Sequence, residues 1–309
     1  MIVFSIVFFK IVSVLLNVII GFLAGRWSKV DRDSIASLLF YFISPIVFFS
    51  IPASTNLSVS SLSITLVTFI IASGLCAFSY RFFAMHYKDS TRNILAMSAG
   101  TGNTGYFMLP IAAALFDDHT LSIYMMAAIG VTIYESTIGY YICVKSISST
   151  TDSIKEVLKL PILNAFALGC LFSFAGITIP DFLDDFTYNM RSAYSILGMV
   201  MIGLGLSTIP KFEIDLKFTA SAFASKFLFY PLGINIFILM DKWFFGWYDE
   251  NCYDALQLLS TAPIAANSIV IASLWKMNPE RVAATVLLSC LFVLLYMPAM
   301  AAIFMRDFG

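Results

Sequence analysis

Charged side chains are scarce in this chain: they make up 12% of its 309 residues, whereas an ordinary soluble domain carries about a quarter. Hydrophobic residues reach 60%, and the mean hydropathy is +0.88. A water-soluble fold of this length has no place for that apolar surplus. The apolar runs are continuous and about 20 residues long, so they predict transmembrane helices and not the shorter, alternating strands of a membrane β-barrel.

The sequence lacks the residues that several functional classes require. The net charge of -1 leaves no broad basic surface for nucleic acid. The two histidines, His86 and His119, fall in loops predicted on opposite sides of the membrane and cannot share a metal. The five cysteines lie in or beside apolar runs and are interpreted as free buried thiols. We therefore expect no enzyme, no metal and no cofactor.

The apolar runs predict an all-α integral membrane protein with ten spans. A Ser- and Thr-rich segment, 146–159, separates five spans from five and is interpreted as a short cytoplasmic linker between domains 1–145 and 160–309. The predicted spans are 3–25, 34–53, 59–83, 92–116, 120–144, 160–177, 191–209, 217–240, 252–275 and 279–305.

Most of the 18 lysines and arginines lie in the odd-numbered loops. Because lysine and arginine gather on the cytoplasmic side, both termini should face outward from a bacterial-type inner (plasma) membrane. Repeating an odd number of spans reverses the second half, so the sequence predicts a five-plus-five inverted repeat. Secondary transporters often follow this plan, with a substrate site where the halves meet near the midplane.

Two corresponding spans, the fourth and the ninth, contain helix-breaking residues. The fourth holds Gly102-Asn103-Thr104-Gly105 and then Pro110, and the ninth holds Pro263 with Asn267. Backbone groups released by a break must line an enclosed or watered cavity. Free N–H groups at half-helix N-termini suit an anion, and the side chains of Asn103, Thr104 and Asn267 add donors. The predicted substrate site comprises Asn103, Thr104, Gly105, Pro110, Pro263 and Asn267. The alternative is that the breaks are kinks tolerated for packing.

Two ionisable residues lie deep in predicted spans. Glu135 is near the middle of the fifth span, and Lys226 lies about ten residues into the eighth. We interpret both as charge-coupling residues, because Glu135 could take up a proton and Lys226 could neutralise a substrate carboxylate or pair with Glu135. The alternatives are a glutamate satisfied by neighbouring hydroxyls and a snorkelling lysine, which is the preferred interpretation for Lys10.

The chain resembles the auxin efflux carrier family, which includes plant PIN carriers and bacterial malate-permease-like proteins. The most specific likeness is Gly102-Asn103-Thr104-Gly105 with Pro110, supported by Lys226 with Pro231 and by Ala262-Pro263 with Asn267. The resemblance implies that spans four and nine cross at their prolines. It also implies that a transport subdomain moves in an elevator-like way against a scaffold, and that both repeats contribute helices to each of these subdomains. A homodimer is implied as well. The long central loop of the plant members is missing.

These observations favour a secondary transporter of a small organic anion, such as an auxin-like carboxylate or a dicarboxylate. Its expected partners are that anion, the lipid bilayer, and a proton or sodium as coupling ion. One alternative is a sodium-coupled symporter of the bile-acid-carrier type, which would use backbone carbonyls near Asn103 and Asn267 as ligands. The other is a membrane sensor that transports nothing.

Overall fold

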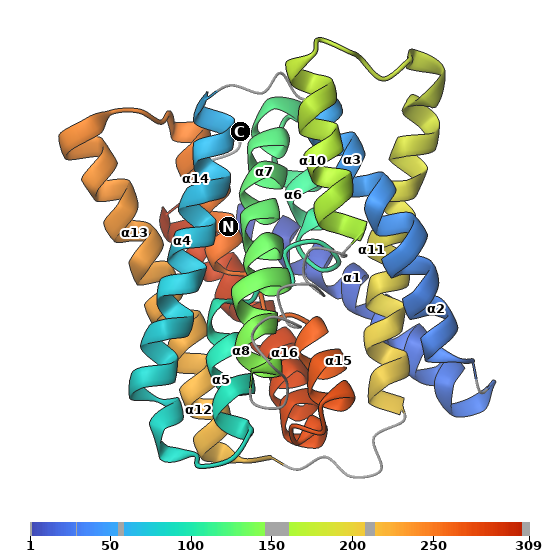
Figure 1. Ribbon diagram of the computed structural model, residues 1–309, viewed down its shortest axis with the longest axis vertical. Coiled ribbons are helices and arrows are strands. Elements are labelled where there is room, and N and C mark those ends of the chain that lie inside the picture. Colours follow the sequence, from blue (N-terminus) through green and yellow to red (C-terminus); the bar gives the residue numbers. More distant parts are fainter. Residues whose placement is uncertain (1, 29, 55–58, 146–160, 208–213, 305–309) are drawn as a thin grey trace.

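The computed structural model describes residues 2–28, 30–54, 59–145, 161–207 and 214–304, and within these ranges all regular structure is helical. The predicted linker 146–159 lies outside them. Most helices run roughly parallel along the long axis (Figure 1). The elements are α1 (Ile2–Trp27), α2 (Arg32–Leu38), η1 (Leu39–Ile43), α3 (Ser44–Ser54), α4 (Val59–Phe82), η2 (Ala84–His86), α5 (Thr91–Gly100), α6 (Leu109–Leu115), α7 (Asp118–Tyr134), η3 (Glu135–Gly139), α8 (Tyr140–Val144), α10 (Pro161–Phe174), η4 (Asp181–Leu183), α11 (Asp184–Ser207), α12 (Leu216–Phe223), η5 (Ala224–Phe229), α13 (Tyr230–Met240), η6 (Asp241–Phe245), α14 (Glu250–Ser260), α15 (Asn267–Leu274) and α16 (Pro279–Phe304).

Among the residues that the structure describes, seven helical segments are long and apolar enough to cross a membrane. They are 8–27, 34–54, 62–82, 118–144, 181–207, 216–245 and 279–304. The three other predicted spans correspond to the 14-residue helix α10 and to two pairs of short helices, α5 with α6 and α14 with α15. The all-helical class is therefore confirmed, with seven candidate membrane spans among the described residues.

The outer surface is apolar, as a bilayer requires. Along η5 and α13, large side chains are exposed at intervals of about four residues: Leu228, Leu232, Ile236 and Leu239. On an α-helix this spacing forms one stripe. A stripe of exposed leucine and isoleucine faces lipid at no cost, whereas in water it would be an aggregation site.

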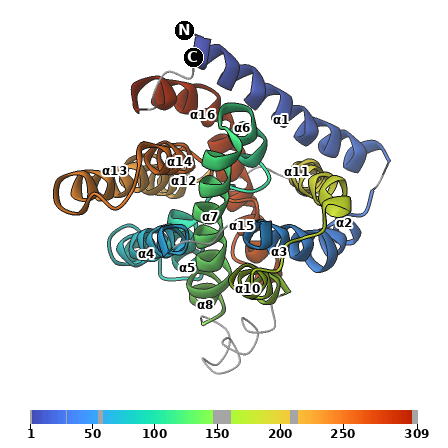
Figure 2. The same ribbon diagram turned by 90° about the horizontal axis from the view of Figure 1, so that it is seen from above.

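The helices separate into two groups (Figure 2). Helices α1, α2, α3, α10 and α11 lie together on one side; we call them the glycine-packed group, because glycines bring their backbones together. Gly21 of α1 faces Val200 of α11 so closely that a Cβ atom would overlap the Val200 carbonyl oxygen. Gly203 of α11 meets Val18 of α1 in the same way. Membrane helices commonly associate through such small residues.

The remaining helices, α4 to α8 and α12 to α16, form the crossover group, with α7 near the centre of the molecule (Figure 2). Helix α7 packs against both α4 and α14. Two π-helical turns of the crossover group hold the predicted ionisable residues: η3, which follows α7, contains Glu135, and η5, between α12 and α13, contains Lys226. Pro231 accounts for η5, because it lacks the N–H group that would bond to the carbonyl of Phe227. The hydroxyl of Tyr296 donates to that carbonyl instead, at 2.8 Å.

Candidate functional site

The two predicted helix breaks are present, and they meet. Helix α5 ends at Gly100 and α6 begins at Leu109, while α14 ends at Ser260 and α15 begins at Asn267. Between them the backbone N–H of Asn103 donates to the carbonyl oxygen of Pro263, at 2.8 Å. Each break thus supplies a hydrogen-bond partner to the other, as buried backbone groups require.

The first break, from 101 to 108, is folded around Asn103. Its side-chain oxygen accepts the backbone N–H of Phe107 at 3.1 Å, and its carbonyl accepts that of Met108 at 3.2 Å. The side-chain nitrogen Nδ2 of Asn103 is buried and has no hydrogen-bond partner among the described residues. A buried amide that lacks an acceptor costs roughly 1–3 kcal/mol, so this group is a candidate donor to a ligand.

Glu135 bridges the two breaks. Its side chain is only 7% exposed. One carboxylate oxygen, Oε1, accepts the backbone N–H of Gly102 at 3.1 Å, and the other, Oε2, accepts Nδ2 of Asn267 at 3.4 Å. One donor that the sequence analysis assigned to an anionic substrate, the side-chain amide of Asn267, therefore donates instead to an anion that belongs to the protein.

Lys226 reaches the same crossing from η5. Its side chain is fully buried at 0% exposure, and its ammonium nitrogen Nζ has no hydrogen-bond partner in the described part of the chain. Nζ lies 3.9 Å from the ring centroid of Tyr230, within cation–π distance. It also approaches Gly102, where a Cβ atom would lie 3.0 Å from it, so a side chain at Gly102 would crowd the ammonium.

Lys226 and Glu135 lie on either side of Gly102 without forming a salt bridge among the described residues. Their charges still compensate each other at the level of the whole site, because one cation and one anion are buried together. The carboxylate has its hydrogen bonds and the ammonium does not. A ligand with acceptor oxygens would supply the hydrogen-bond acceptors that the Lys226 ammonium lacks among the described residues.

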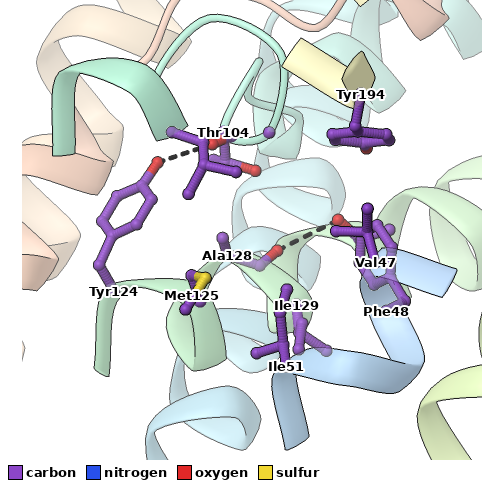
Figure 3. Close-up of a pocket in the computed structure, with 12 residues that line it drawn as sticks. Val47, Phe48, Ile51, Thr104, Tyr124, Met125, Ala128, Ile129 and Tyr194 are labelled. Atoms are coloured by element: carbon purple, nitrogen blue, oxygen red, sulfur yellow. Dashed lines mark hydrogen bonds between the residues drawn. The ribbon is translucent and has the colours of Figure 1, made fainter. Parts of the chain in front are cut away.

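A small pocket opens beside the first break, between the two helix groups (Figure 3). Val47, Phe48 and Ile51 of α3 form one wall, and Thr104 and Gly105 of the break form another. The phenol of Tyr124 donates to the carbonyl of Thr104 at 2.8 Å, which fixes the wall contributed by α7. Most of the lining is apolar; the remaining residues are Leu109, Met125, Ala128, Ile129, Thr132 and Tyr194.

The predicted site residues thus fall into two sets. Asn103, Thr104, Gly105, Pro263 and Asn267 lie at the crossing or next to it, with Glu135 and Lys226. Pro110 lies in the first turn of α6 and contributes to the start of that helix. Sequence reasoning missed the pocket aromatics Phe48, Tyr124 and Tyr194, because aromatic residues make up 16% of the chain and carry no distinguishing pattern.

Comparison with known proteins places this arrangement among transporters. Residues 6–156 match the family described as membrane transport protein. Over 302 residues the chain is 25% identical to an uncharacterized transporter of Methanocaldococcus jannaschii, an alignment that covers 92% of this chain and 95% of that protein. The aligned region is therefore long enough to span the positions of both breaks and of both buried ionisable residues.

Proposed function

We propose that this chain is a transporter of the membrane transport protein family, similar to the auxin efflux carriers, and that it carries a small organic anion whose carboxylate binds at the crossing of the two breaks. The observation that carries the proposal is the buried ammonium of Lys226 without a hydrogen-bond acceptor, next to a first break that also leaves Nδ2 of Asn103 unpaired. Both groups are donors, so an anion satisfies both.

The pocket beside the crossing has room for about one water molecule, so the proposal requires it to widen when the rest of the substrate enters. It touches the first break through Thr104 and Gly105 and is otherwise mainly apolar. A carboxylate held at the crossing would therefore extend its carbon skeleton toward α3 and α7. Polar groups at one end and apolar walls at the other are typical of binding sites for small molecules.

For the mechanism, we propose elevator-type alternating access in an inverted repeat of two five-helix halves, 1–145 and 160–309. The crossover group, which holds both breaks, is the moving transport subdomain, and the glycine-packed group is the scaffold. The support is that the backbones of α1 and α11 are in direct contact through Gly21 and Gly203, whereas α3 and α7, which belong to different groups, both line the pocket. The protein is proposed to be a homodimer in a bacterial-type inner membrane, with both termini outside.

Glu135 is proposed to couple substrate binding to a proton. In the empty site, the negative charge of Glu135 balances the positive charge of Lys226. A bound carboxylate adds one negative charge, and a proton taken up by Glu135 restores neutrality in a site where uncompensated charge is costly. Sodium has less support, because the carbonyls of Gly102, Asn103 and Pro263, which would be its ligands, already accept N–H groups.

The test is uptake of radiolabelled mono- and dicarboxylates into liposomes that contain the purified protein, with proton or sodium gradients imposed separately. Wild-type protein is expected to transport at least one acid, and Lys226→Met to transport none, because it removes the cation that faces the substrate. Lys10→Met is the matched control, since Lys10 is exposed on α1. Stoichiometric ligand binding without uptake would favour a sensor, and an absolute requirement for sodium would favour the symporter.

A further inference from the structure

Tyr230 is a buried tyrosine next to the crossing, and the protein gives its hydroxyl no partner. It is the first residue of α13 and directly follows η5, the turn that contains Lys226. Its side chain is 0% exposed, and its hydroxyl has no hydrogen-bond partner among the described residues. Buried tyrosine hydroxyls usually have such a partner, and a buried hydroxyl without one lowers stability. This exception calls for a physical reason.

The ring of Tyr230 lies against the ammonium of Lys226, and that ammonium lies against both breaks. Nζ is 3.9 Å from the ring centroid. A Cβ atom on Gly102 would lie 3.0 Å from Nζ, 3.3 Å from Cγ2 of Thr104 and 3.4 Å from Cβ of Ala262. Gly102 and Thr104 belong to the first break, and Ala262 belongs to the second. The Tyr230 hydroxyl, at the edge of the ring whose face meets Nζ, is therefore a close neighbour of the crossing.

A second tyrosine relates this hydroxyl to the pocket. The phenol groups of Tyr230 and Tyr124 are close enough to interact electrostatically. Tyr124 lines the pocket, and its hydroxyl donates to the carbonyl oxygen of Thr104 at 2.8 Å (Figure 3). Of these two neighbouring hydroxyls, that of Tyr124 already has an acceptor in the first break. The hydroxyl of Tyr230 keeps its proton available for a ligand.

Tyr230 adds a third donor to the two already described at the crossing. Nζ of Lys226 and Nδ2 of Asn103 can only donate, and both lack acceptors among the described residues. An ionised carboxylate accepts hydrogen bonds only, and its two oxygens offer about four lone-pair sites. One carboxylate can therefore accept from all three groups.

We propose that Tyr230 is a substrate-binding residue: its hydroxyl donates to the same carboxylate as Lys226 and Asn103, and its ring positions the ammonium for that contact. This inference rests on the proposed function and on the widening of the pocket that it requires. The ring attracts the charge of Lys226, and this attraction is strongest where water is excluded. An ammonium has three N–H donors and the ring covers one side of it, so donors remain for the carboxylate.

Two substitutions separate the hydroxyl from the ring in the liposome uptake assay. Tyr230→Phe keeps the ring and loses the donor. It is expected to raise KM about tenfold or more with little change in the maximal rate, because a hydrogen bond to a charged group is lost equally from the bound substrate and from the transition state. Tyr230→Leu also loses the ring, so it is expected to raise KM further than Tyr230→Phe does.

The matched controls are Tyr248→Phe and Tyr248→Leu. Tyr248 is also buried, but its hydroxyl is hydrogen-bonded to that of Ser63 at 2.7 Å. It lies just before α14, at the opposite end of that helix from the second break. Both control variants are expected to keep the wild-type KM.

Thermal unfolding without organic acid gives a measurement that does not depend on transport. Tyr230→Phe should unfold at the wild-type temperature or above it, because its hydroxyl has no partner to lose. Tyr248→Phe should unfold at a lower temperature, because it loses its bond to Ser63. A lower midpoint for Tyr230→Phe would show that the hydroxyl already has an acceptor, in the protein or in a bound water, and would overturn the inference.

The uptake results distinguish this inference from the proposed function. If wild-type protein transports an acid and Tyr230→Phe has the same KM, the hydroxyl does not bind the carboxylate, and the proposed function stands. If Tyr230→Leu has the KM of Tyr230→Phe, the ring does not position Lys226. If wild-type protein transports no organic acid, the proposed function fails and this inference fails with it.

Discussion

The two helix groups bury their closest contacts in opposite ways. In the glycine-packed group, Gly21, Gly203 and Gly169 bring backbone against backbone. In the crossover group, charged side chains are buried, and the ammonium of Lys226 has no acceptor within the described residues. Close apolar packing stabilises a membrane protein, whereas an unsatisfied buried cation costs stability. This loss of stability falls on the crossover group, where a bound ligand can supply the missing hydrogen-bond acceptor.

The largest effect is expected when the glycine packing is broken. Gly203→Leu should prevent stable assembly of α1 on α11, with a loss of about 3 kcal/mol or more, because the atoms it would strike are backbone atoms that cannot turn aside. Thermal unfolding in detergent, followed by size-exclusion chromatography, measures this. The control is Gly74→Leu, which should behave like wild type. Similar melting curves for the two variants would mean that α1 and α11 do not depend on their close approach.

The opposite sign is expected at the crossing. Lys226→Met should raise the stability of the ligand-free protein by about 1–3 kcal/mol, because it replaces an unpaired buried ammonium with an apolar chain of similar length. The thermal unfolding midpoint in the absence of organic acids is the measurement. A lower midpoint would show that the ammonium has an acceptor in the protein, such as a bound water or ion, and would remove the contrast between the two groups.

Two substitutions of Glu135 distinguish the effect of its hydrogen bonds from the effect of its charge. Glu135→Gln keeps an oxygen that can accept the N–H of Gly102, so its stability should fall by less than about 1 kcal/mol, whereas Glu135→Ala should lose about 2 kcal/mol with both bonds. Uptake by the glutamine variant should no longer respond to an imposed proton gradient. An unchanged response would exclude Glu135 as the coupling residue and leave it a structural acceptor.

The smallest effect is expected within the crossover group but away from the crossing. The side-chain oxygen Oδ1 of Asn235 accepts a hydrogen bond from Nε2 of Gln257 at 2.8 Å. Its Nδ2 donates to the carbonyl oxygen of Pro231 at 2.8 Å. Interhelical hydrogen bonds in membranes average about 0.6 kcal/mol, so Asn235→Ala should cost about that much and leave uptake unchanged. A clear loss of uptake would extend the functional region along α13 and α14.

The local breaks could be predicted from the sequence, because glycine, proline and small polar residues interrupt helices wherever they occur. Three glycines and Pro110 indicated the first break, and Pro263 indicated the second. That the breaks meet was implied only by the family resemblance. The hydrogen bond from Asn103 to Pro263 joins residues far apart in the chain, and no local pattern reports such a contact.

Other features were hidden for identifiable reasons. The predicted span began at 191, but α11 begins at Asp184. Its first residues are acidic and were interpreted as part of a loop, although acidic side chains are favourable in the first turn of a helix. The sequence suggested Lys226 or, as the alternative, the adjacent hydroxyls as partners of Glu135, whereas its hydrogen bonds come from Gly102, which is 33 residues away, and from Asn267. The π-helical turns at Glu135 and Lys226 left no sequence signal beyond Pro231.

The hydrogen bond between the N–H of Asn103 and the carbonyl of Pro263 has one further consequence. It is made entirely by main-chain atoms, so no exchange of side chains deletes it unless proline replaces Asn103. The surrounding residues can therefore be altered to suit a different cargo while the two half-helices keep their attachment. A designer seeking a new specificity could vary the pocket walls extensively and retain the junction itself.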